Sequence, residues 1–169
     1  NYSNKDVNYL NFNELRSLFE KGSFQEVIVE GNKTLNFVSK DFKIHNLIGA
    51  AYLSLNNFDE AIKFFKNSIK LNENCPYSYN NLGVAYKAKK DFSNAIRSYD
   101  EAIKINPTYD DALSNLGLMY WEIGNLELAF SNLNLAIKHN PNHAKSYNNL
   151  GLLYQTLSLI HISEPTRRA

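Results

Sequence analysis

The sequence that decides the fold is Ser78-Tyr79-Asn80-Asn81-Leu82-Gly83-Val84-Ala85-Tyr86. A near copy, Ser-Tyr-Asn-Asn-Leu-Gly-Leu-Leu-Tyr, occupies residues 146–154, and a third version, Leu-Ser-Asn-Leu-Gly-Leu-Met-Tyr, occupies residues 113–120 midway between them. The triplet Asn-Leu-Gly therefore recurs every 34 residues, and Ile48-Gly49 extends the register one step upstream. A fixed period of this length is typical of a solenoid built from stacked repeats.

Apolar residues within each 34-residue unit recur at helical spacing. In the middle unit, Tyr79, Leu82 and Tyr86 mark one face of a first helix, while Ala95 and Tyr99 mark a second helix. Small residues recur with the same period, and we expect them to let the two helices of a unit approach closely. They are Gly49, Gly83, Gly117 and Gly151 in the first helices and Ala61, Ala95 and Ala129 in the second helices.

Helix start and stop signals follow the same register. The predicted N-caps of the second helices, 34 residues apart, are Ser23, Asn57, Asp91 and Asn125. Glu26 and Glu60 stand three residues after the first two of these caps, which predicts two capping boxes. Pro107 and Pro141 are expected to stop second helices, and Pro76 to begin a first helix.

These features together resemble the tetratricopeptide repeat family, whose 34-residue unit is a pair of antiparallel helices. The resemblance implies an all-α fold, a right-handed α-solenoid of helix pairs over residues 1–156. The repeats are expected at 42–75, 76–109 and 110–143, after a degenerate repeat at 8–41 and before an unpaired half-repeat at 144–156. Terminal repeats of a solenoid are commonly atypical because one of their faces meets solvent.

The chain ends in a segment that departs from the repeat pattern. Residues 157–167 match, in eleven consecutive positions, the translation of a transposase-based sequencing adapter. We therefore expect residues 157–169 to be a disordered tail foreign to the natural protein, and the natural protein to be longer. Residues 1–7 are polar and are expected to be a frayed lead-in.

Composition and charge exclude several classes of protein. The chain has 18 lysines and arginines against 17 acidic residues, so it lacks the basic surface on which nucleic-acid binding depends. No window approaches 18 uninterrupted apolar residues, so no membrane span is expected. Cys75 is the only cysteine, which excludes an internal disulfide. We expect a cytoplasmic protein.

No catalytic or cofactor-binding constellation is found. His139 and His143 have the spacing of a zinc-binding pair, but Pro141 between them prevents one helix from carrying both, so no metal site is expected. Cys75 has no histidine at a recognisable spacing, and both Cys75 and His45 are interpreted as packing residues. The sequence therefore predicts no enzyme activity in this chain and no cofactor.

The family resemblance implies a protein-interaction module that binds an extended peptide or partner segment in a groove lined by the first helices. The alternative is the substrate-recruiting arm of a larger transferase, such as a glycosyltransferase, whose catalytic domain lies beyond residue 156. Weak self-association through the uncapped last repeat is a further expectation.

The groove-facing positions of the first helices carry a column of asparagines. A carboxamide both donates and accepts, so a column of them suits the backbone of an extended peptide, and the arrangement is similar to the asparagine ladder of O-linked N-acetylglucosamine transferase. Asparagine before Leu-Gly can also simply stabilise neighbouring backbone. The predicted peptide-binding residues are Asn46, Asn80, Asn81, Lys87, Asn115, Leu118, Trp121, Asn148 and Asn149.

Overall fold

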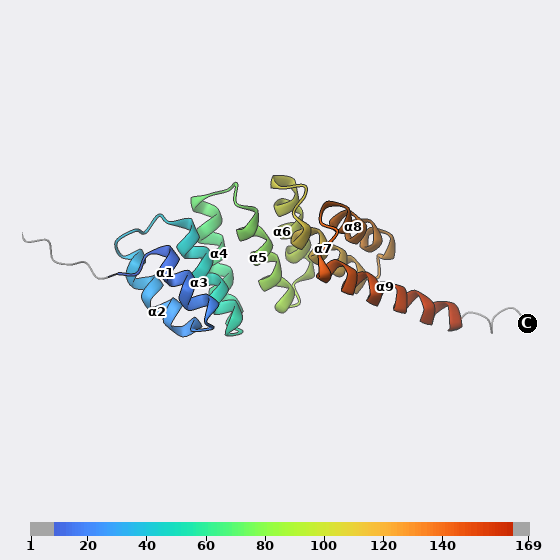
Figure 1. Ribbon diagram of the computed structural model, residues 1–169, viewed down its shortest axis with the longest axis horizontal. Coiled ribbons are helices and arrows are strands. Elements are labelled where there is room, and N and C mark those ends of the chain that lie inside the picture. Colours follow the sequence, from blue (N-terminus) through green and yellow to red (C-terminus); the bar gives the residue numbers. More distant parts are fainter. Residues whose placement is uncertain (1–8, 164–169) are drawn as a thin grey trace, which may run out of the picture. The chain divides into compact units, whose positions relative to one another are not determined.

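The computed structural model describes residues 9–163, and within them it shows nine α-helices and no β-strand (Figure 1). The all-α prediction is thereby confirmed. The predicted lead-in at 1–7 and the last six residues of the predicted tail, 164–169, lie outside the described residues. The helices are α1 (Phe12–Glu20), α2 (Phe24–Leu35), α3 (Phe42–Ser54), α4 (Phe58–Leu71), α5 (Pro76–Ala88), α6 (Phe92–Ile105), α7 (Asp110–Glu122), α8 (Leu126–His139) and α9 (Ala144–Ser163).

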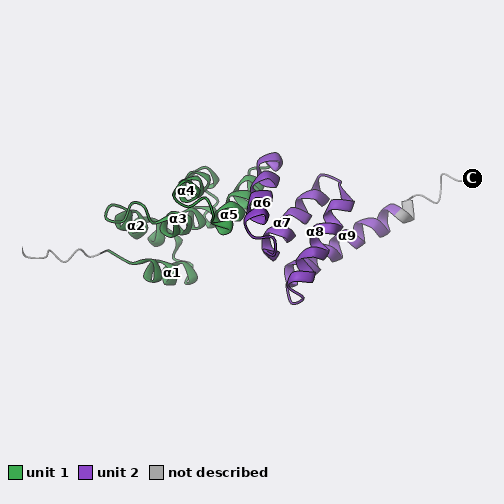
Figure 2. Cartoon of the chain, turned by 90° about the horizontal axis from the view of Figure 1, so that it is seen from above, with its two compact units in different colours: residues 1–90 green, residues 91–169 purple. Residues whose placement is uncertain are grey.

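The chain forms two compact units, which Figure 2 shows in different colours. Unit 1, residues 1–90, holds α1 to α5, and unit 2, residues 91–169, holds α6 to α9. The division falls between Lys90 and Asp91, in the turn inside the third sequence repeat. Each unit is described below by itself.

The helices keep the 34-residue register of the sequence. The four helices that follow long inter-repeat connections, α3, α5, α7 and α9, begin at residues 42, 76, 110 and 144. The turns inside the repeats keep it too, because the backbone enters the left-handed region of φ just before each second helix, at Gly22, Asn56, Lys90 and Gly124. Glycine adopts that conformation without strain, whereas a lysine side chain disfavours it.

The predicted N-cap positions of the second helices are confirmed, but the predicted capping boxes are not found. Ser23 and Asn57 stand at the N-cap positions of α2 and α4 without a side-chain cap hydrogen bond. Their own backbone N–H groups donate to the carbonyl oxygens of Leu18 and Tyr52, so these N–H groups are not available to the carboxylates of Glu26 and Glu60. Glu60 pairs with Lys63 instead of reaching back to its cap. The capping box found in the structure belongs to α1, where Asn11 and Glu14 satisfy each other's backbone N–H groups.

The prolines act as predicted at three helix ends. Helix α5 begins at Pro76, whose missing N–H is no loss in the first turn of a helix. Helices α6 and α8 end two residues before Pro107 and Pro141. The prolines therefore fix where the connections between repeats lie, and α5, α7 and α9 begin after these connections.

In unit 1, the core lies between successive helices, which approach each other closely where a glycine of one helix faces a large side chain of the next. Gly31 of α2 faces Ile48 of α3, and Gly49 of α3 faces the ring of Phe65 of α4, with a distance of 2.7 Å from the position of a Cβ on Gly49 to that ring. The periodicity of small residues predicts that Ala61 lies opposite Gly49. Ala61 is fully buried, but the closest approach is made one helical turn later, by Phe65.

In unit 2, Gly117 of α7 faces Leu133 and the backbone oxygen of Ala129 on α8, so the predicted glycine–alanine contact is present and Leu133 adds to it. Helix α9 contributes Leu153 to the same core. Gly151 of α9, at the same place in the Asn-Leu-Gly motif, has no atom within 4 Å of its Cβ position. The first helix of a fifth repeat is therefore present without a partner on that side.

Helix α9 is longer than the predicted half-repeat at 144–156. It continues to Ser163, so residues 157–163 of the predicted disordered tail are helical. The physical reason is that no glycine or proline interrupts residues 152–163, and a helix once begun extends at little cost through such a sequence.

Candidate functional site

In unit 1, two predicted site residues on consecutive first helices pair with each other. Asn81 of α5 donates from Nδ2 to Oδ1 of Asn46 on α3 at 3.2 Å, and both side chains are half-buried. Asn80, next to Asn81, is only 7% exposed. Of these three, Asn46 and Asn81 therefore form the accessible amide pair.

In unit 2, the predicted asparagines are tied to the neighbouring repeat in the same way. Asn149 of α9 donates to the Ser114 hydroxyl at 3.0 Å, and the ammonium of Lys145 donates to Oδ1 of Asn115 at 2.6 Å. Asn115 itself is only 6% exposed. The amide column of the sequence is thus a set of side chains that bridge successive first helices.

The remaining predicted residues differ in exposure. Trp121 is half-buried, donates from its indole nitrogen to the Thr156 hydroxyl at 3.1 Å, and packs against the core that contains Leu153. Leu118 and Lys87 are half-buried, while Asn148 is exposed. The indole N–H of Trp121 therefore joins α7 to α9, while part of the side chain remains exposed to solvent.

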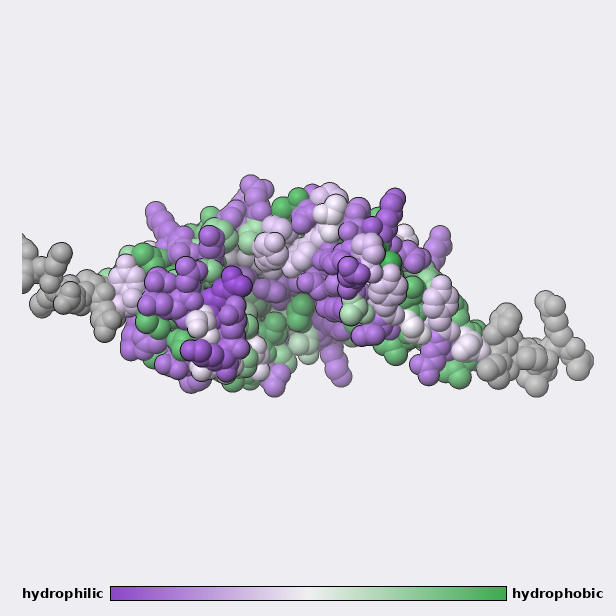
Figure 3. All heavy atoms as spheres, viewed as in Figure 1, coloured by the Kyte–Doolittle hydropathy of each residue, from purple (hydrophilic) through white to green (hydrophobic). Residues whose placement is uncertain are grey.

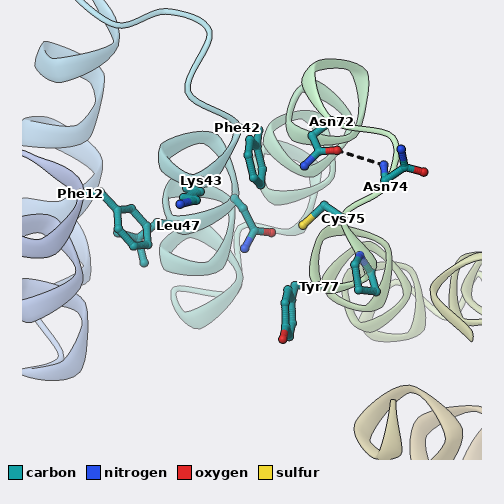
Figure 4. Close-up of a pocket in the computed structure, with 10 residues that line it drawn as sticks. Phe12, Phe42, Lys43, Leu47, Asn72, Asn74, Cys75 and Tyr77 are labelled. Atoms are coloured by element: carbon teal, nitrogen blue, oxygen red, sulfur yellow. Dashed lines mark hydrogen bonds between the residues drawn. The ribbon is translucent and has the colours of Figure 1, made fainter. Parts of the chain in front are cut away.

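A pocket on unit 1 was not predicted from the sequence, apart from one residue, Asn46. It has a volume of about 440 Å³ and lies between α1, α3, the α4–α5 connection and the start of α5 (Figure 4). Its lining is Phe12, Phe42, Lys43, Asn46, Leu47, Asn72, Asn74, Cys75, Pro76 and Tyr77. Tyr77 is 59% exposed. A tyrosine at the second position of a first helix was the sequence signal that could have indicated this pocket.

Two of the histidines, His45 and His143, and the cysteine have structural partners. Helix α8 ends at His139 and His143 precedes α9, so the two do not share a helix, as predicted. His45 lies 3.0 Å from the Ser39 carbonyl oxygen, with its ring near Phe64. The buried Cys75 thiol accepts a weak hydrogen bond from the Ser78 hydroxyl.

A polar cluster joins the start of α7 to the start of α9. Asp110, Asp111 and His143 carry potential ligand atoms within 4.8 Å of one another. His143 contacts Asp111 through Nε2 and Ser146 through Nδ1, while Asn140 donates to Asp110. Partial burial acts to raise the pKa of Asp110, but the hydrogen bonds from Asn140 and from the backbone of Asp111, together with nearby His143, lower it overall.

No helix among the described residues combines the length and apolar character needed to cross a membrane.

Residues 42–75 and 76–109 match one family profile described as Tetratricopeptide repeat, and residues 110–143 match a second with the same description. No curated protein matches the chain at a significant level.

Several solved structures resemble this one. A crystal structure of MamA is 25% identical, with a TM-score of 0.76 over 90% of this chain and 88% of that chain. YrrB, described as a TPR protein with an unusual peptide-binding site, is 17% identical with a TM-score of 0.70, covering 91% and 80%. The first TPR of Spaghetti (RPAP3), bound to the HSP90 peptide SRMEEVD, is 24% identical with a TM-score of 0.66, covering 71% and 95%.

Proposed function

Because the chain belongs to the tetratricopeptide repeat family, we propose that it is a protein-interaction module that binds an extended peptide segment along its first helices. The observation that carries the proposal is the row of amide side chains on those helices. In unit 1 the row is the pair Asn46 and Asn81 on α3 and α5, and in unit 2 it includes Asn149 on α9.

The chemistry of these amides suits a peptide backbone. Asn81 uses its Nδ2 on the Asn46 oxygen, so this bond leaves the carbonyl oxygen of Asn81 and the NH₂ group of Asn46 unused. One is an acceptor and the other a donor, which is what the N–H and C=O of a single extended residue require. The internal hydrogen bond also holds both side chains in place, so less conformational entropy is lost on binding.

The proposal is tested with a library of unstructured peptides and the triple variant Asn81→Ala, Asn115→Ala and Asn149→Ala. A matched control replaces three exposed asparagines of second helices, Asn32, Asn67 and Asn134, with alanine. Circular dichroism establishes that both variants are folded. We expect the parent and the control to retain peptides that the triple variant loses, and equal retention by the folded triple variant would remove the amides from the mechanism.

A further inference from the structure

The pocket on unit 1 has walls that suit a large apolar side chain. Phe12 of α1 and Phe42 of α3 are half-buried, Leu47 is buried, and Tyr77 stands largely exposed at the edge. Figure 4 shows Phe12 on the opposite side of the pocket from Tyr77 and Cys75. A volume of about 440 Å³ leaves room for an aromatic ring and the backbone next to it.

The amide side chains on the lining use their oxygens within the protein and so offer mainly hydrogen-bond donors to a ligand. The side-chain oxygen of Asn72 accepts from the N–H of Asn74 at 3.1 Å, and the oxygen of Asn46 accepts from Asn81. The NH₂ groups of Asn46 and Asn72 are therefore the parts of these amides that remain for a ligand. In Figure 4 the amide nitrogen of Asn72 points away from Asn74, toward the side of Phe42.

Among the described residues that line the pocket, Lys43 is the one that carries a charge. Lys43 is exposed, and its ammonium lies 6.0 Å from the centre of the Phe12 ring. Within the described residues its side chain contacts no carboxylate. An ammonium over an aromatic ring, beside two amide donors, favours a ligand that brings a negative charge.

We propose that this pocket binds a peptide segment in which a large aromatic side chain is flanked by acidic residues. The aromatic ring enters between Phe12, Phe42 and Tyr77, and a neighbouring carboxylate lies at Lys43. The Asn46 and Asn72 amides donate to the carboxylate or to the peptide carbonyl groups. This proposal rests on the peptide-binding function above and adds to it the chemistry of the partner and the place where its main side chain binds.

The test uses three fluorescent peptides, blocked at both ends and otherwise identical, with the centres Asp-Phe-Asp, Lys-Phe-Lys and Asp-Ala-Asp. Fluorescence anisotropy with the full chain should show the first binding at least about tenfold more tightly than either of the others. Its affinity should fall as salt is raised, since the Lys43 contact is exposed to solvent. Equal binding of the first and third peptides would overturn the proposal, because the aromatic side chain would then contribute nothing.

Two pairs of variants locate the binding. Lys43→Gln should weaken the Asp-Phe-Asp peptide roughly fivefold, while Lys70→Gln, which removes an exposed lysine of α4 outside the pocket, should leave it unchanged. Tyr77→Ala should weaken it more than about tenfold, while Tyr147→Ala, at another exposed tyrosine, should not. Loss of affinity in both members of each pair would contradict binding in this pocket.

Failure here is distinguishable from failure of the proposed function. If the peptide library contains binders that neither favour acidic and aromatic residues nor respond to Tyr77→Ala, this pocket proposal is wrong and the peptide-binding function stands. If the folded parent retains no library peptide, the proposed function is wrong as well.

Discussion

Gly117 of α7 lies so close to Leu133 of α8 that a Cβ added to Gly117 would stand 2.8 Å from the Leu133 Cγ atom and 3.1 Å from the Ala129 carbonyl oxygen. The same motif residue in α9, Gly151, has open space around its Cβ position. The two glycines share a sequence context and differ only in whether a second helix covers them.

This pair predicts opposite effects of one substitution. Gly117→Ala should lower the free energy of unfolding by about 1 to 2 kcal/mol, because overpacking outweighs the gain in helix propensity. Gly151→Ala should raise it by up to about 1 kcal/mol, since only the propensity changes. Chemical denaturation of both variants is the measurement, and stabilisation by Gly117→Ala would show that the α7–α8 contact is looser than described.

The turn before α6 holds a lysine in an unfavourable conformation. Lys90 has φ +61°, at the position where two other repeats have glycine. Lys90→Gly should therefore raise the free energy of unfolding by about 1 kcal/mol. Gly124→Ala, where the new Cβ meets no atom within 4 Å, should lower it by a similar amount. A thermal melt in which Lys90→Gly is the less stable protein would contradict this account of the turn.

Tyr99 of α6 is fully buried, and within the described residues its hydroxyl makes no hydrogen bond. Burial, with a smaller contribution from the charge of Glu122, raises the pKa of the phenol. The positions 34 residues before and after are Phe65 and Leu133, which are apolar. Tyr99→Phe should therefore leave stability unchanged or raise it by about 1 to 2 kcal/mol. Destabilisation by more than about 1 kcal/mol would mean that the hydroxyl has a partner after all.

The cluster at the start of α7 predicts an acid-sensitive contribution to stability. The pKa of Asp110 is below its ordinary value of 3.8, so the folded state favours the ionised carboxylate. This stabilisation is present above pH 3.8 and is lost as the pH falls through the lowered pKa. The stability difference between the parent and Asp110→Asn should therefore shrink in that acidic range. Glu127→Gln, at an exposed acid of α8, is the control, and a difference that stays constant with pH would exclude the effect.

Helix α9 exposes apolar side chains along its described part, including Leu152 at 44% and Tyr154 at 57% exposure, and Figure 3 shows hydrophobic residues among hydrophilic ones there. With no second helix packed on Gly151, opening this helix breaks few buried contacts. Amide hydrogen exchange should be faster in residues 151–160 than in residues 110–122. Equal protection of both stretches in a monomeric sample would show that α9 is held as firmly as α7.

The helices and their ends were predictable because their causes are local in the sequence. The local causes are the 34-residue period, the side-chain caps Asp91 and Asn125 of α6 and α8, and the three prolines Pro76, Pro107 and Pro141. Glycine marks two of the four left-handed turn positions, but Lys90 carries no such mark, since only the geometry of the turn forces its backbone there.

The candidate site was predictable only in part. The recurrence of asparagines on first helices can be read from the sequence alone, because the period places Asn81, Asn115 and Asn149 at equivalent positions. The packing of the helices was needed to find that Asn81 donates to Asn46 and that Asn115 is nearly buried and accepts from Lys145. It was also needed to find which of the motif glycines is crowded and which has open space. It also decided that Phe12 and Tyr77, 65 positions apart in the sequence, line one pocket. The physical reason is that hydrogen-bond partners, burial and cavities depend on distances between helices, which no local sequence signal encodes.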